Sequence, residues 1–160
     1  MAVDLLYKIS RAEPYAVSDE NFFFADNLLG SMRVLPVLIR DRGLTGAAKV
    51  VAKIALGRCT YFGLRQGSMP QSTGTLALGH CRFYPVEGDA IVIGEIVTVP
   101  DRRGRGLATL SIMLAVNGAI RRGTKTFYID TQRNNHAMQR SIAKLGFGAP
   151  IGGDAAGGPW

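Results

Sequence analysis

The fold is decided by Thr98-Val99-Pro100-Asp101-Arg102-Arg103-Gly104-Arg105-Gly106-Leu107-Ala108-Thr109, which joins two apolar runs, residues 90–99 and 107–120. The first run has the character of a strand and the second that of a helix. Pro100 has no amide to donate to a neighbouring strand, so the strand is expected to end there. The stretch therefore predicts a strand, a tight turn and a helix in direct succession.

The turn inside this stretch has the features of a phosphate-binding site. Gly104 and Gly106 lack a Cβ, so the backbone N–H groups there can point into the turn. Unpaired amides and the positive end of the helix dipole attract an anion. Arg102, Arg103 and Arg105 surround the same turn, and guanidinium groups match the oxygens of phosphate. The ligand is therefore expected to carry a pyrophosphate.

Two common nucleotide sites do not fit this turn. A P-loop needs Lys and then Ser or Thr after its last glycine, whereas Gly106 is followed by Leu107 and Ala108. A Rossmann fingerprint needs a third glycine where Thr109 stands and an acidic residue further on, which Asp130 would mimic. Only one strand-helix-strand unit is expected after the turn, which leaves no second nucleotide-binding half.

Two segments resemble the GCN5-related N-acetyltransferases (GNAT). Residues 103–108 read Arg-Gly-Arg-Gly-Leu-Ala and match the family's Arg/Gln-x-x-Gly-x-Gly/Ala turn, which holds the pyrophosphate of acetyl-CoA. Residues 135–147 read Asn-His-Ala-Met-Gln-Arg-Ser-Ile-Ala-Lys-Leu-Gly-Phe and resemble the family's Asn-x-x-Ala-x-x-x-Tyr-x-Lys-x-Gly-Phe. The second segment is most similar to the ribosomal-protein alanine acetyltransferase subgroup. The resemblance covers residues 90–147 in the family's order.

The resemblance implies an α/β fold, the GNAT fold, with a mixed central sheet flanked by helices. This sheet consists of an antiparallel meander plus one parallel strand. The implied activity is direct transfer of an acetyl group from acetyl-CoA to a primary amine, which belongs to a small molecule, a peptide or a protein. The residues that the resemblance places on acetyl-CoA are Ile96, Val97, Thr98, Arg103, Gly104, Arg105, Gly106, Leu107, Ala108, Thr109 and Asn135. Asn135 is alternatively a plain helix cap.

Glu95 is the first of two candidate catalytic bases. Alternation along the predicted strand places it on one face with aliphatic neighbours. An unpaired carboxylate in such a place has a raised pKa and serves as a base near neutral pH. The alternative is that this face is partly wet and that Glu95 pairs with an arginine. The aliphatic residues expected on this face are Ile91, Ile93, Val97 and Val99.

Asp130 is the second candidate, on a parallel strand predicted over residues 125–131. By the resemblance it falls where the ribosomal-alanine subgroup has a strand glutamate, the proposed general base. Because aspartate is shorter, a water is expected to bridge it to the amine. The alternatives are that Asp130 caps the turn at 132–134 or pairs with Arg133.

The sequence departs from the family pattern at two places. Ile142 stands where many relatives carry a tyrosine acid, and isoleucine cannot donate a proton. Residues 148–160 are rich in glycine and lack the alternation of the family's final hairpin. The sheet is therefore expected to end early, with an acceptor pocket that is open or completed by another chain. Trp160 is expected to belong to a free tail, or else to anchor the tail in a groove or across a homodimer contact.

Length and composition favour one domain at residues 1–147, followed by a glycine-rich tail at 148–160. The chain has 160 residues, of which 47% are hydrophobic, enough for one core. No long apolar run or signal-peptide pattern is present, so a cytoplasmic protein without membrane contact is expected. Cys59 and Cys81 form no disulfide framework, and no histidine completes a zinc spacing, so no metal is expected.

The formal net charge of +7 suits an anionic partner. Coenzyme A accounts for the arginine cluster at 102–105, whereas a nucleic-acid surface would show a basic helix face or interleaved aromatics. A solvated basic surface is therefore favoured over a nucleic-acid partner. Two alternative functions stay open: an idle acetyltransferase fold that binds a protein or nucleic acid, and acetylation of aminoacyl-tRNA.

The first half of the chain is predicted from pattern alone. We expect a strand at 5–9, a helix that begins near Ser18 and carries Phe22, Phe23 and Phe24, an interruption at Pro36, and a second helix from Thr45. The two helices border the acceptor groove in the family. Strands are then expected at 59–65, 75–84 and 90–99, with a helix at 107–120.

Overall fold

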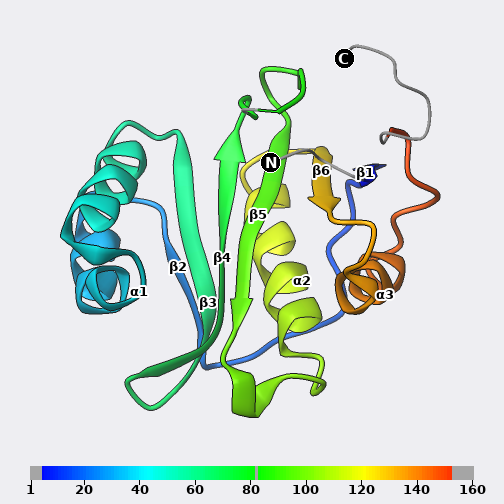
Figure 1. The fold of residues 1–160 in the computed structure, drawn as a ribbon. Coiled ribbons are helices and arrows are strands. Elements are labelled where there is room, and N and C mark those ends of the chain that lie inside the picture. Colours follow the sequence, from blue (N-terminus) through cyan, green and yellow to red (C-terminus); the bar gives the residue numbers. More distant parts are fainter. Residues whose placement is uncertain (1–4, 82, 153–160) are drawn as a thin grey trace.

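The computed structural model describes residues 5–81 and 83–152, which form an α/β fold around one mixed sheet (Figure 1). Its strands lie in the order β1-β6-β5-β4-β3-β2. The predicted fold class, an antiparallel meander plus one parallel strand, is confirmed. The elements are β1 (Leu5–Ser10), β2 (Phe22–Ala25), α1 (Leu28–Ala55), β3 (Cys59–Gln66), β4 (Met69–Leu78), β5 (Ile91–Thr98), the 3₁₀ turn η1 (Pro100–Arg102), α2 (Leu107–Ile120), β6 (Thr126–Thr131) and α3 (His136–Lys144).

The meander β3-β4-β5 and the crossover to β6 follow the sequence prediction. α2 connects β5 to β6, and the two strands pair in parallel, from Ile91 with Phe127 to Ile93 with Ile129. Both boundaries of the middle strand were wrong: residues 69–74 belong to β4 and not to a loop, and the strand predicted to run to residue 84 ends at Leu78. Gly67, with φ 61°, makes the hairpin tight enough for β4 to begin two residues later.

The region predicted as the first helix begins with a strand. Phe22–Ala25 forms β2, which pairs with β3, and α1 begins only at Leu28. Phe22 and Phe24 pack against the cluster under α2, whereas Phe23 packs against the cluster under α1. This period of two is that of a strand, and β-sheet packing of aromatic side chains explains why the helix prediction was wrong.

α1 is broken at a glycine and not at its proline. Pro36 lies inside the helix, while Gly43 has φ 70° and ψ 174°, which are not helical angles. The second half of α1 corresponds to the helix predicted from Thr45. Because Gly43 has no neighbouring atom within 4 Å of a Cβ position, the break is exposed at the surface.

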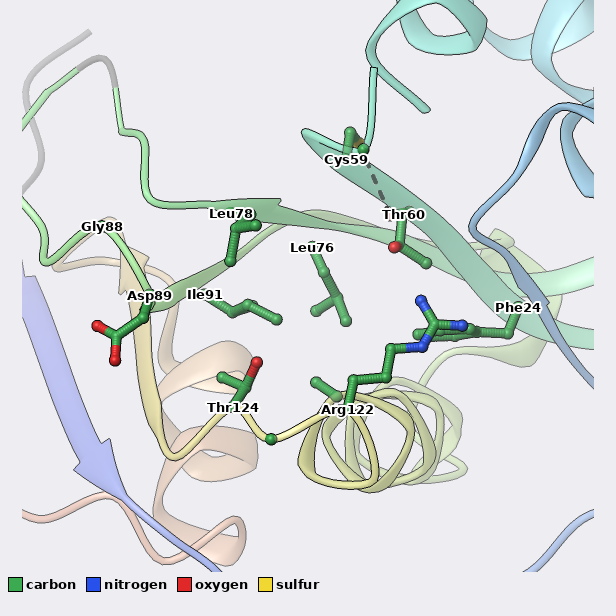
Figure 2. Close-up of a pocket in the computed structure, with 13 residues that line it drawn as sticks. Phe24, Cys59, Thr60, Leu76, Leu78, Gly88, Asp89, Ile91, Arg122 and Thr124 are labelled. Atoms are coloured by element: carbon green, nitrogen blue, oxygen red, sulfur yellow. Dashed lines mark hydrogen bonds between the residues drawn. The ribbon is translucent and has the colours of Figure 1, made fainter. Parts of the chain in front are cut away.

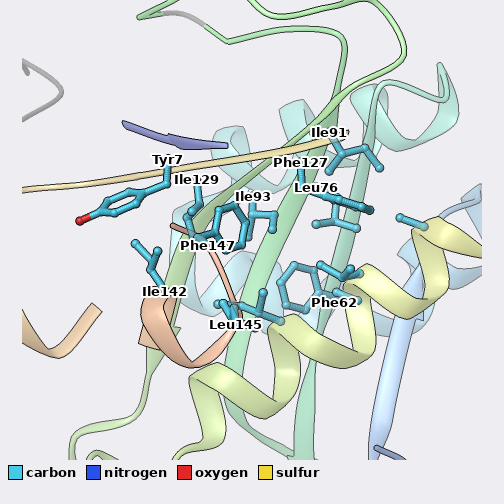
Figure 3. Packing of buried hydrophobic residues seen from close by; sticks show 14 residues of the cluster. Tyr7, Phe62, Leu76, Ile91, Ile93, Phe127, Ile129, Ile142, Leu145 and Phe147 are labelled. Carbon is cyan, nitrogen blue, oxygen red and sulfur yellow. The ribbon is translucent and has the colours of Figure 1, made fainter. Parts of the chain in front are cut away.

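The two faces of the sheet carry separate cores. Phe62 lies in the cluster that α2 and α3 cover (Figure 3), and its neighbour Tyr61 lies in the cluster under α1. Ile142 of α3 is fully buried in the first cluster. The position at which the family motif has a tyrosine is therefore a core position in this chain.

The first strand, and not a final hairpin, forms the edge of the sheet beyond β6, since no strand follows α3 in the described residues. β1 pairs antiparallel with β6 and forms the edge beyond it. Gly152 then bridges to Leu6, which keeps the end of the described chain at this edge. The predicted tail contact of Trp160 lies outside the described residues. In the described ranges, no helix has the length and apolar character needed to cross a membrane.

Asn27 is expected to contribute to stability as the N-cap of α1. Its Oδ1 accepts a hydrogen bond from the backbone N–H of Gly30 at 2.8 Å. Asn27→Ala should lower the free energy of unfolding by about 1 kcal/mol, measured by urea denaturation. Asn27→Asp retains the acceptor and should leave that free energy nearly unchanged; equal stability of the Ala variant and the parent protein would contradict this role.

Candidate active site

The sheet splits between β5 and β6. Their ladder stops at the pair Ile93 and Ile129, although β5 continues to Thr98 and β6 to Thr131. From Gly94 onwards, the edge of β5 that faces β6 pairs with none of the described strands. Backbone N–H and C=O groups at this edge are therefore available to a ligand.

A β-bulge marks the beginning of the split. Thr75 is opposite Gly94 and Thr73 is opposite Val97, so β5 holds one extra residue here. Glu95 lies in the bulge with φ 54°, the one positive φ of a non-glycine residue in the described chain. Because of the extra residue, Ile96 joins the core cluster that contains Ile91 and Ile93. The predicted alternation, with Glu95 on that aliphatic face, is therefore wrong.

Glu95 pairs with an arginine, which was the alternative interpretation of the sequence. Its Oε2 lies 2.9 Å from an Nη of Arg42 and accepts a hydrogen bond from the Thr75 hydroxyl at 3.1 Å. Partial burial tends to raise the pKa of Glu95, but the Arg42 and Thr75 contacts outweigh it and hold the pKa below the ordinary value. The prediction of a raised pKa was therefore wrong, and Glu95 is a weak base in this state.

Asp130 is the carboxylate with a raised pKa. It follows directly after the last ladder pair, and its Oδ2 accepts a hydrogen bond from the Tyr84 hydroxyl at 3.0 Å. Burial raises the pKa of Asp130, and the hydrogen bond from Tyr84 partly opposes this shift. Tyr84 was missed in the sequence because it lies in the loop after β4, where only the fold brings it to β6.

The phosphate turn has the predicted backbone. After η1, Gly104 and Gly106 have φ 75° and 76°, the left-handed region that favours glycine. Gly106 is the N-cap of α2, and no side chain caps this helix. A Cβ at either glycine would meet no atom within 4 Å, so the space above the turn is open. The first amides of α2 therefore face a hollow that has room for an anion.

The turn, the split end of β5 and one face of α3 line a cavity of about 560 Å³. Arg105 is the exception among the residues predicted to bind the cofactor, because it borders an adjacent hollow together with Arg102 and Leu107. The predicted residues that the cavity brings together are Ile96, Val97, Thr98, Arg103, Gly104, Gly106, Leu107, Ala108, Thr109 and Asn135.

α3 contributes residues that were not among the predicted cofactor contacts. Ala137, Arg140, Ser141 and Lys144 recur at helical spacing and line the same cavity. That spacing is the signal that would have revealed them. Asn135 is the cap of α3, because its Oδ1 accepts a hydrogen bond from the Met138 N–H at 3.1 Å. The residue also borders the cavity, which is where the predicted cofactor contact would need it.

A second hollow, of about 410 Å³, adjoins the cavity on the α1 side of β5. We call it the β5 groove. It contains Glu95, Arg42 and Tyr61, and it shares Val97, Thr98 and Arg103 with the cavity. The two hollows therefore meet at the end of β5. Its further lining is Arg40, Asp41, Pro70, Gln71, Ser72, Thr73, Val99 and Pro100.

A separate cavity of about 470 Å³ lies at the far end of α2 (Figure 2). Arg122, which pairs with Asp26 and lies over the Phe24 ring, borders it together with Cys59. Burial raises the pKa of the Cys59 thiol to about 11, so this group is protonated near neutral pH and a poor nucleophile. Because α2 separates this cavity from the phosphate turn, we do not assign it to the active site.

Known proteins provide a comparison for this arrangement. Residues 55–147 match the model of the acetyltransferase (GNAT) family. A solved GNAT-family protein from Novosphingobium aromaticivorans has 20% identity and a TM-score of 0.63, over 93% of this chain and 61% of that chain. The aminoglycoside N-acetyltransferase AAC(6')-Iy in complex with CoA has 14% identity and a TM-score of 0.63, over 86% of this chain and 94% of that chain.

A third solved structure, a protein from Clostridium acetobutylicum with acetyl-CoA, has 20% identity and a TM-score of 0.58, over 80% of this chain and 89% of that chain. At these identities the likeness shows a shared fold. The chain spans less than two thirds of the Novosphingobium protein, and none of the curated proteins matches it.

Proposed function

Because the chain belongs to the acetyltransferase (GNAT) family, we propose that it transfers an acetyl group from acetyl-CoA to a primary amine. The observation that carries this proposal is the cavity in which the phosphate turn, the split strand and α3 meet. Acetyl-CoA supplies the activated acetyl thioester. The residues of this chain bind it, hold its carbonyl and handle the proton of the amine.

The cavity fits the diphosphate and pantetheine of acetyl-CoA. The open space above Gly104 and Gly106 is what a Cβ would fill, and the uncapped start of α2 offers amides to phosphate oxygens. Arg103, Arg140 and Lys144 add positive charge to the walls. The unpaired edge of β5 after Gly94 would then lie along the pantetheine arm and bind the thioester oxygen through its amides.

We assign the role of general base to Asp130. A lysine-like amine at pH 7 must lose a proton at a cost of about 4.6 kcal/mol, because its pKa lies about 3.4 units above the pH. Asp130 has a raised pKa and stands where the strands separate, whereas the carboxylate of Glu95 is held by Arg42. Asp130 would accept the proton through a bridging water, and Glu95 would orient the ammonium form of the acceptor.

Ile142 does not argue for an idle fold. Its side chain is fully buried in the core, and Ser141 beside it borders the cavity. A thiolate is a good leaving group because the conjugate thiol has a pKa near 8.5, so departure does not need a tyrosine acid. The intact turn and the two adjoining hollows favour transfer over mere binding.

The proposal is tested by mixing the protein with acetyl-CoA and a panel of amines and following release of free thiol. Thiol release that depends on the amine, with acetylated amine found by mass spectrometry, is the expected result. Binding of CoA in calorimetry without thiol release for any amine would instead support the idle fold. Loss of the free amine on charged tRNA alone would support acetylation of aminoacyl-tRNA.

Tyr84→Phe is expected to shift the pH profile of kcat/KM. The Tyr84 hydroxyl donates to Asp130 and stabilises its ionised form, so its removal raises the pKa of Asp130 further. The acid limb of the profile, where Asp130 becomes protonated and inactive as a base, should move to higher pH. Tyr128→Phe is the matched control, because that hydroxyl donates to Glu87. A limb that stays in place or moves to lower pH in Tyr84→Phe would contradict the assignment.

A further inference from the structure

A pair of opposite charges lines the β5 groove. We infer that its acceptor is a zwitterionic primary amine, one that carries a carboxylate close to its amino group, as an α-amino acid does. The pair is formed by Arg42 and Glu95, 2.9 Å apart. This inference rests on the proposed acetyl transfer and names the substrate class for it.

Both members of the pair are held by unusual backbone. Glu95 lies in the bulge with φ 54°, a strained conformation for glutamate. Because the bulge turns Glu95 out of the α2-side core, its carboxylate meets α1 across the groove. Arg42 comes directly before Gly43, the non-helical residue at which α1 breaks. The break therefore determines where the guanidinium stands, and the bulge determines where the carboxylate stands.

The partial burial of the Arg42 guanidinium makes ligands with a single positive charge unfavourable. The Arg42 side chain is 25% exposed and that of Glu95 is 56% exposed. An ammonium that displaced Arg42 from Glu95 would leave a largely buried guanidinium without its partner, which is costly. A zwitterion avoids this cost, because its ammonium binds Glu95 while its carboxylate binds Arg42. One ion pair is exchanged for two, and the amine arrives beside the strand end shared with the cavity.

The remaining charges of the groove disfavour polycations. Arg40 pairs with Asp41 at 2.8 Å, so this pair adds no net charge. Arg103 also lines the groove, and its Nε donates to the backbone oxygen of Thr98 at 3.2 Å. The arginines of the groove thus outnumber its carboxylates. A polyamine or aminoglycoside would bring several positive charges into an already positive groove.

The test compares α-amino acids with their methyl esters, which keep the amine and lose the carboxylate. The panel includes small, apolar, acidic and basic side chains, together with spermidine and neamine as polycations. We expect kcat/KM for the preferred amino acid to exceed that of its ester by about 10- to 100-fold, since a charge-assisted bidentate pair is lost. The amine of the ester loses its proton more easily than that of the free amino acid. Intrinsic reactivity alone would therefore favour the ester, which is opposite to the expected result.

Arg42→Gln should lower kcat/KM for the amino acid by about tenfold or more and leave the value for the ester within about threefold. The matched control is Arg33→Gln, an exposed arginine on the same helix outside the groove. Loss of the difference between acid and ester in Arg42→Gln, but not in Arg33→Gln, would support the inference. Equal rates for acids and esters, or a preference for spermidine or neamine, would overturn it.

The inference and the proposed function fail in different ways. Amine-dependent thiol release without preference for zwitterions overturns the inference and leaves acetyl transfer standing. Absence of thiol release with every amine overturns acetyl transfer, and calorimetry of the CoA-bound protein then decides the inference. Binding of the α-amino acid, but not of its ester, that disappears in Arg42→Gln supports the zwitterion site, and absence of such binding overturns it.

Discussion

Asp130→Asn is expected to lower kcat by about 10²- to 10⁴-fold, the usual contribution of a positioned base. Asparagine has nearly the same shape, and its carbonyl oxygen can still accept the Tyr84 hydrogen bond, so the fold around β6 should persist. The KM for acetyl-CoA should stay within about twofold, because Asp130 does not line the cofactor cavity. Steady-state thiol release measures both constants.

Asp89→Asn is the control for this variant. Asp89 is an exposed carboxylate at the end of the loop before β5, and it borders the far cavity shown in Figure 2. Its replacement should leave kcat unchanged. If Asp130→Asn kept most of the activity while Glu95→Gln abolished it, the base would be Glu95 and the assignment to Asp130 would be wrong.

Gly106→Asn is expected to weaken CoA binding by about 10- to 100-fold, equivalent to about 1.4–2.8 kcal/mol. Asparagine tolerates the left-handed conformation that Gly106 adopts, so backbone strain is small. Its side chain would occupy the open space above the turn and displace a phosphate from the first amides of α2. Calorimetry with CoA measures the loss directly.

Gly67→Asn separates this steric effect from the backbone effect. Gly67 has φ 61° and open space around its Cβ position, as Gly106 has, but it lies in the β3-β4 hairpin outside the cavity. The control should bind CoA like the parent protein and melt at a similar temperature. Equal CoA affinity of Gly106→Asn and the parent protein would mean that the diphosphate does not lie on this turn.

The parts of the fold that were predicted correctly depend on local chemistry. Pro100 and the two glycines fix the end of β5 and the start of α2 within a few residues, so Leu107–Ile120 was predicted with its observed bounds. Asn135 as a cap and the parallel placement of β6 follow from similarly local rules and from the handedness of the crossover.

The parts that were missed depend on partners distant in sequence. Phe22–Ala25 becomes a strand because it pairs with the edge of β3, and no local sequence pattern predicts that pairing. The bulge at Glu95 is visible only in the register with β4, so the sequence placed this carboxylate on the wrong face. Tyr84 reaches Asp130 across 46 positions of chain, which a motif search does not detect.

The pairing of β1 with β6 has a consequence for the order of folding. β1 leaves the ribosome before the other strands of the sheet, yet its ladder partner β6 is made only after α2. During synthesis β1 therefore stays unpaired until β6 has been made, and its apolar side chains are accessible to other nascent chains and to chaperones. Pairing of β1 with β6 is therefore a late, long-range step of folding. If this step is slow, the environment of Asp130, which lies opposite Leu6 in the ladder, also forms late.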